Sequence, residues 1–270
     1  MYRFIAWATF GCLISSTAGA ISTPSVDLYV DQYFTQTPVE VFTDFVDADG
    51  AYAFQQRINN AFKARGHKTI GYKLALTGKP RLFGAPDPLH GHLFDFMLRK
   101  NHASLSAKSF VKPLLELELA YQFKADFLPP FTTQKLASAI SSVAPAIELA
   151  DLVFKHPKQL SWQQVAASGT GARRLIIGEA RPFTSLNLNN QQAEARWNGE
   201  PYTRGYSRNV MGDQQQALIF LAQSLHRQGQ KIKAGDWVIT GAMNKMLPAR
   251  PGNYRVNFGA LGELEFSLTP

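Results

Sequence analysis

Apolar residues recur along the chain with two different periods. Between residues 51 and 65, Phe54, Ile58 and Phe62 lie four positions apart. This spacing predicts the apolar face of a helix, and Gly66 is a typical residue at which a helix ends.

In the next segment, apolar residues recur with a period of two. In TIGYKLALTG, residues 69–78, apolar side chains occupy every second position, which predicts a strand. Lys73 falls on the other face together with Gly71 and Ala75. Their small side chains are expected to leave room for a ligand above the sheet.

Two acidic residues interrupt one face of a second predicted strand. In LLELELAYQF, residues 114–123, Glu116 and Glu118 point to the same side, about 7 Å apart along the strand. Two carboxylates at this spacing repel each other unless a cation or a proton lies between them. A hard divalent cation with a third carboxylate would satisfy this pattern, and so would a solvated strand face. The spacing leaves both interpretations open.

The remaining pattern interleaves helices and strands, with strands in the majority. It predicts a helix-like segment at 135–143, an extended run at 146–149, a hairpin turning at Asn198-Gly199, a helix from the Asp213 cap to Gly229, and short strands after it. No internal repeat is evident. The predicted class is therefore α+β with a β-rich core.

The first twenty residues, MYRFIAWATFGCLISSTAGA, have a cationic start, an apolar run and a small-residue end. This is typical of a signal peptide cleaved after Ala20, so a periplasmic or secreted protein is expected. The apolar run is too short to span a bilayer, so no stable membrane insertion is expected after cleavage. Residues 21–270 are expected to form a single domain.

The composition excludes several classes of functional site. Cys12 is the only cysteine, so the mature chain would have no thiol nucleophile, zinc–thiolate site or iron–sulfur cluster. The formal charge of +8 would fall to +7 with the loss of Arg3. The cationic residues are dispersed, which favours an anionic small molecule or simple solubility over nucleic acid.

The order of several motifs resembles one enzyme family. The motifs are GYKLALTG, FGAPDPLHG, ELELAYQF, APAIELAD, LIIG, ALIFLAQSL, AGDWVITG and PGNYRVNFGALGELEF. Between about Ala53 and Phe266 the chain is similar to the 2-keto-4-pentenoate hydratase-like branch of the fumarylacetoacetate hydrolase (C-terminal domain) superfamily. The resemblance implies a mixed β-sheet roll with peripheral helices, assembled as a homo-oligomer.

The resemblance also implies a site. A divalent cation, Mg2+ or Mn2+, would be held by Glu116, Glu118 and Glu148. The implied activity is that of a hydro-lyase acting on a 2-hydroxydienoic or 2-keto-enoic acid through a metal-bound enolate. Lys73 matches the family's catalytic lysine, which would offset the substrate carboxylate or relay a proton, a role that calls for a lowered pKa.

Two substrate-binding positions follow from the same resemblance, Asp87 and Thr240. Asp87 directly precedes Pro88, one place out of the family's register, so a turn former is an equal interpretation. Thr240 is equally explained as a β-branched strand residue. His90 and His92 are expected in a loop, where they could reach a ligand, although loop histidines are more often simply solvated.

The chain departs from the family pattern at 166–171 and at 212–214, both expected near the substrate. Other reactions therefore stay open, namely those of an acylpyruvate hydrolase and of a keto-acid decarboxylase or tautomerase. A non-catalytic carboxylate-binding relative is the alternative from another class. The expected partner in every case is a small keto or enol carboxylic acid.

Overall fold

The computed structural model describes residues 25–42, 47–78, 81–183 and 188–270. The expected signal peptide, with its cleavage after Ala20, lies outside these residues. Within the described ranges, no helix is both long and apolar enough to cross a membrane.

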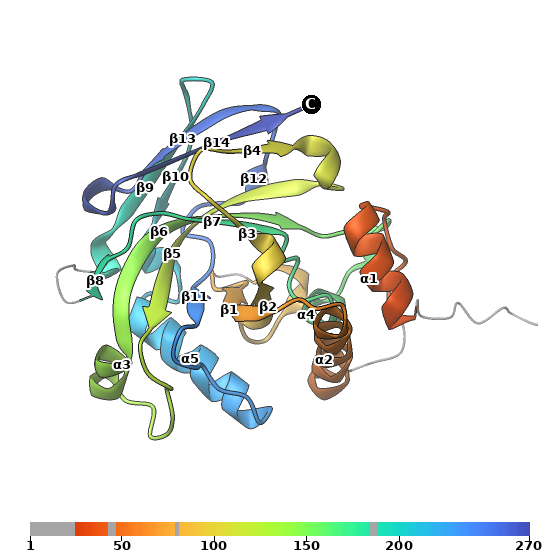
Figure 1. Ribbon diagram of the computed structural model, residues 1–270, viewed down its shortest axis with the longest axis horizontal. Helices are drawn as coiled ribbons and strands as arrows, with labels where there is room; N and C mark the ends of the chain where they lie inside the picture. The colour runs from red at the N-terminus through yellow and green to blue at the C-terminus, as the bar shows by residue number, and fades with distance from the viewer. Residues whose placement is uncertain (1–24, 43–46, 79–80, 184–187) are drawn as a thin grey trace, which may run out of the picture.

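Two mixed sheets form the centre of the structure (Figure 1). The strands are β1 (Thr69–Ala75), β2 (Leu89–Phe94), β3 (Leu98–Arg99), β4 (Ala103–Ser106), β5 (Pro113–Phe123), β6 (Ile140–Asp151), β7 (Arg174–Ile177), β8 (Arg181–Pro182), β9 (Gln192–Trp197), β10 (Glu200–Tyr206), β11 (Trp237–Ile239), β12 (Leu247–Pro248), β13 (Gly252–Asn257) and β14 (Glu263–Thr269). The larger sheet has the order β2-β1-β11-β5-β6-β7-β3, with β12 beside β5 and β8 beside β6. The smaller sheet has the order β10-β9-β13-β14-β4.

The helices lie around these sheets. They are α1 (Val26–Thr35), α2 (Ala48–Ala64), α3 (Thr133–Ala139), α4 (Trp162–Ala167) and α5 (Gln214–Arg227). Figure 1 shows α1, α2 and α4 gathered in one group, and α3 packs against α5 in another. The predicted α+β class, a mixed-sheet roll with peripheral helices, is confirmed.

The two faces of β5 have different surroundings. Leu115, Leu117 and Leu119 are fully buried in a core that also includes residues of the smaller sheet and of α5. Burying each leucine contributes about 1.5–3 kcal/mol, so this face orients the strand firmly. Because side chains alternate, Glu116 and Glu118 must then point to the opposite side.

Several predicted elements are confirmed. The helix expected at 51–65 is α2, which begins one turn earlier because Asp47 caps it by accepting a hydrogen bond from the N–H of Gly50 at 2.8 Å. The predicted strands at 69–78 and 114–123 are β1 and β5. The predicted hairpin is β9–β10, and Asp213 caps α5 as expected.

Three local expectations are wrong. The helix-like segment 135–143 ends at Ala139, because the next residues are β-branched or small and pair with β5 at the start of β6. His90 and His92 lie buried on β2, paired with β1, and not in a loop. Gly71 does not leave room for a ligand, since a Cβ there would lie 1.7 Å from the carbonyl oxygen of Trp237.

Candidate metal centre

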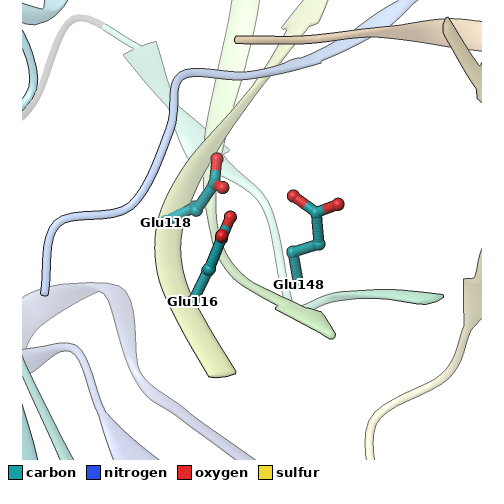
Figure 2. Close-up of side chains that lie close together, drawn as sticks. All are labelled: Glu116, Glu118 and Glu148. Atoms are coloured by element: carbon teal, nitrogen blue, oxygen red, sulfur yellow. The ribbon is translucent and has the colours of Figure 1, made fainter. Parts of the chain in front are cut away.

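Strand pairing brings three glutamates together. In the antiparallel β5–β6 ladder Glu116 lies directly opposite Glu148, and Glu118 is two residues further along β5. Figure 2 shows their carboxylates converging, and one oxygen from each lies within 4.8 Å of the others. The residues are 6%, 0% and 1% exposed, respectively. Acidic residues this deeply buried require a counter-charge.

Lys73 supplies part of that charge. Its Nζ lies 2.6 Å from both carboxylate oxygens of Glu148, donates a hydrogen bond to Oε1, and donates a second to the carbonyl of Thr170 at 3.3 Å. Strands β11 and β5 separate β1 from β6, which would place them about 14 Å apart in a flat sheet. The ion pair is possible because the sheet curls around the site.

The described residues do not give every carboxylate oxygen of the cluster a hydrogen-bond partner. The N–H of Gly241 donates to Oε2 of Glu118 at 2.7 Å, but Oε1 of Glu118 has no hydrogen-bond partner among the described residues. Oε2 of Glu148 also accepts no well-aligned hydrogen bond, although Nζ of Lys73 is close to it. Buried acceptors are rarely left in this way. Oxygen donors with free lone pairs are what a hard divalent cation requires.

The charge balance supports the same interpretation. Burial raises the pKa of Glu118 well above its usual value, and the charges of Glu148 and Glu116 raise it further. Burial also raises the pKa of Glu148, although Lys73 opposes this. Three carboxylates and one ammonium leave two negative charges in the site when all are ionised. A divalent cation would neutralise them, so the residues present fit such an ion.

The expected lowering of the Lys73 pKa is wrong for the protein alone. Burial by itself would lower this pKa, but Glu148, Glu116 and Glu118 outweigh burial and raise it. The carboxylates that raise it come from β5 and β6, so their effect on Lys73 appears only in the folded chain.

A cavity of about 380 Å³ opens beside Glu116. Ala75 lines it, as expected from its place on the Lys73 face of β1, and so does Thr170. A volume of this size suits a small organic ligand. The carboxylate cluster therefore borders a space that a substrate could enter.

The two predicted substrate-binding residues lie outside the cavity lining. Thr240 is fully buried, and its hydroxyl donates to Oε1 of Gln214 at 2.7 Å. Asp87 is exposed. Neither belongs to the cavity lining among the described residues, and their role in substrate binding stays a prediction.

The loop that contacts Lys73 lies within 166–171, a segment expected near the substrate. Gly169, Thr170 and Gly171 have φ values of 73°, 60° and 71°, a run of left-handed residues that turns the Thr170 carbonyl toward the lysine. A Cβ on Gly91 would lie 2.4 Å from the carbonyl oxygen of Gly169, so glycine is required where this loop meets β2.

Comparisons with known proteins agree with this geometry. No family model matches the chain. The 2-keto-4-pentenoate hydratase of Burkholderia vietnamiensis (strain G4 / LMG 22486) is 28% identical over 229 residues, which cover 83% of this chain and 87% of the relative. The 4-oxalocrotonate decarboxylase of Pseudomonas sp. (strain CF600) is 26% identical over 215 residues, covering 78% and 81%. The chain is similar to the hydratase-like branch of the fumarylacetoacetate hydrolase superfamily.

A solved structure shares the fold of this chain. The 4-oxalocrotonate decarboxylase from Pseudomonas putida G7, complexed with magnesium and adipate, superposes with a TM-score of 0.85 at 23% identity and covers 90% of this chain and 95% of its own. The departures from the superfamily pattern at 166–171 and 212–214 fall on Thr170, beside Lys73, and on Gln214, beside Thr240. The first departure therefore lies in the site, and the second lies behind it.

Proposed function

We propose that the protein is a divalent-metal-dependent lyase that hydrates a 2-hydroxydienoic or 2-keto-enoic acid. The main observation behind this proposal is the buried cluster of Glu116, Glu118 and Glu148. Lys73 donates a hydrogen bond to Glu148, and a small cavity lies beside Glu116. Curated relatives named as hydratases, and solved relatives that contain magnesium or manganese, support it.

The three glutamates would hold Mg2+ or Mn2+, whose contribution is Lewis-acid stabilisation of negative charge on substrate oxygens. Lys73 directs its ammonium at Glu148 in this cluster and would offset the substrate carboxylate or hold a proton at Nζ. Its hydrogen bond to the Thr170 carbonyl restrains it there. The buried surroundings keep bulk water from screening these charges.

A 2-hydroxydienoic acid would first ketonise: its enol O–H proton is lost and a proton is added at C5, which gives a 2-keto-3-enoic acid. Water then adds across the C3–C4 double bond, with the hydroxyl at C4 and the proton at C3. The product is a 4-hydroxy-2-keto acid, in which one new C–O bond and one new C–H bond replace that π bond. The protein's part is to hold the keto acid end so that negative charge developing on its oxygen is stabilised.

Decarboxylation is the second candidate. The decarboxylase relatives are as similar in sequence as the hydratases, at 26% against 28% identity, and a decarboxylase shares the fold at a TM-score of 0.85. Loss of CO2 from a keto acid and hydration of a dienol both develop an enolate, so one set of side chains can serve either.

Incubation of the purified protein with Mg2+ and a panel of these acids tests the proposal. Loss of the dienol absorbance, followed by product analysis, is expected to reveal a 4-hydroxy-2-keto acid. Release of CO2 without that product would identify the decarboxylase. Folded, metal-loaded protein that converts no member of the panel would point instead to a carboxylate-binding relative.

Export stays a separate prediction. The small residues Ala18 and Ala20 suit a signal peptidase, so the secreted protein is expected to begin at Ile21. N-terminal sequencing after expression in a secreting host measures this, and a mature chain that still begins at Met1 would rule it out. Homo-oligomeric assembly likewise remains part of the proposal.

A further inference from the structure

Two cationic side chains line the cavity beside Glu116, and the proposed reaction assigns no role to either of them. Arg81 and Lys245 both line it. Within the described ranges, neither forms an ion pair with a carboxylate. Among the described residues of the lining, Glu116 is the only acidic one, and it belongs to the candidate metal-binding cluster.

The guanidinium of Arg81 has unused hydrogen-bond donors among the described residues. Its Nη1 donates to the carbonyl of Pro86 at 3.0 Å, but its Nε is buried and has no hydrogen-bond partner among the described residues. Leaving a buried charged donor unpaired is unfavourable unless a ligand satisfies it. The planar guanidinium has the donor geometry that matches a carboxylate.

Much of the remaining wall is apolar. Leu76, Leu82, Phe83, Leu152 and Met246 line the cavity together with the two cations. Such a wall suits the hydrocarbon middle of an acid, and the cations suit a charged end. A ligand with a single carboxylate engaged at the glutamate cluster would leave Arg81 without a partner.

We propose that the substrate is a dicarboxylic keto or enol acid whose second carboxylate is bound by Arg81, with Lys245 adding positive charge. This inference rests on the proposed function, because the first carboxylate is assigned to the metal centre. Arg81 is then a specificity-determining residue that selects a doubly charged substrate over a singly charged one of equal length.

Two non-reacting acids of the same length provide the test, hexanedioate (adipate) and hexanoate. Calorimetry with the magnesium-loaded wild type is expected to show about 10- to 100-fold tighter binding of hexanedioate, because one carboxylate gains charge-assisted hydrogen bonds. Arg81→Met is expected to remove this preference. Arg81→Lys, which keeps the charge without the planar group, is expected to retain part of it.

Arg208→Met is the matched control, since Arg208 is exposed, lies outside the cavity and stacks on Tyr206. It should keep the wild-type preference. Melting curves identify any variant that fails to fold, and Arg81→Lys then decides in place of Arg81→Met. Equal binding of the two acids by the wild type, or an undiminished preference in folded Arg81→Met, would overturn the proposal.

Turnover separates this inference from the proposed function. Conversion of a monocarboxylic dienol acid with a kcat/KM equal to or above that of its dicarboxylic counterpart would overturn the inference and leave the lyase function standing. Selective binding of hexanedioate that is lost in Arg81→Met, without turnover of any acid, would support the Arg81 site and overturn the lyase function.

Discussion

Lys73→Met is expected to lower kcat of the magnesium-dependent reaction about 100- to 10,000-fold. In the folded chain Nζ lies 2.6 Å from Glu148, which is paired with Glu116 at the edge of the cavity proposed for the substrate. Methionine has a similar length but no charge and no proton to donate. The interaction strengthens as negative charge develops on the substrate, so the loss should fall on kcat more than on KM. Steady-state kinetics with the best substrate measure both constants.

Lys73→Met and the wild type must be compared at a saturating concentration of Mg2+. Without Lys73, Glu148 is buried without its cation, which costs about 3–5 kcal/mol in the metal-free protein. Mn2+ binding should persist because all three glutamates remain, and Lys124→Met, at an exposed position, should behave as wild type. Unchanged kcat in Lys73→Met would make the lysine a structural counter-ion only. Weaker ligand binding, with no turnover in either protein, would favour a binding protein.

Local periodicity predicted the parts of the site that depend on a single strand. Alternation alone places Glu116 and Glu118 on one face of β5, and Lys73 opposite the apolar face of β1. These positions need no knowledge of the rest of the fold. The helix α5 was predictable for a similar reason, since its cap and its apolar spacing are both local signals.

The remaining parts depend on pairing between distant segments. Nothing near Glu148 in the sequence shows that it lies opposite Glu116, and only the resemblance to the superfamily pointed to it. The buried position of His90 requires β2 to pair with β1, which a Pro-rich approach to that strand concealed. Turn residues and short strands compete in such a segment, and tertiary pairing decides.

Electrostatic character was the least predictable property. The pKa of Lys73 depends on burial and on three carboxylates from two other strands, and these effects oppose each other. The unpaired Nε of Arg81 is likewise visible only once the surrounding chain is folded. Charges of this kind follow from distances in three dimensions, so residue types in sequence order do not reveal them.

Glu118→Gln is expected to weaken Mn2+ binding about 100-fold or more while leaving the fold intact. Substitutions outside the ligand shell typically cost 10- to 100-fold in metal affinity, so the loss of a charged ligand should cost at least as much. Oε1 of Glu118 has no partner within the described structure and is free to bind a cation. Glutamine has the same shape, and its carbonyl oxygen can still accept the hydrogen bond that Gly241 donates to Oε2. Calorimetric titration with Mn2+ gives the two dissociation constants.

Stability without metal provides an independent readout of the same cluster. Burial and the neighbouring carboxylates raise the pKa of Glu118 well above its usual value, so its ionised form opposes folding. Removing that charge should leave the melting temperature of the metal-free variant equal to or above that of the wild type. Added Mn2+ should then raise the melting temperature of the wild type much more than that of the variant, because only a ligand that binds the folded state tightly stabilises it.

Glu200→Gln is the matched control, since Glu200 is exposed at the start of β10 and lies far from the cluster in the β9–β10 hairpin. It removes the same charge from the chain and should change neither Mn2+ affinity nor the metal-dependent rise in melting temperature. A Glu118→Gln variant that bound Mn2+ as tightly as the wild type would exclude this carboxylate as a ligand. The raised pKa of Glu118 would then reflect a glutamate held protonated by burial, and the superfamily's metal chemistry would have no basis in this chain.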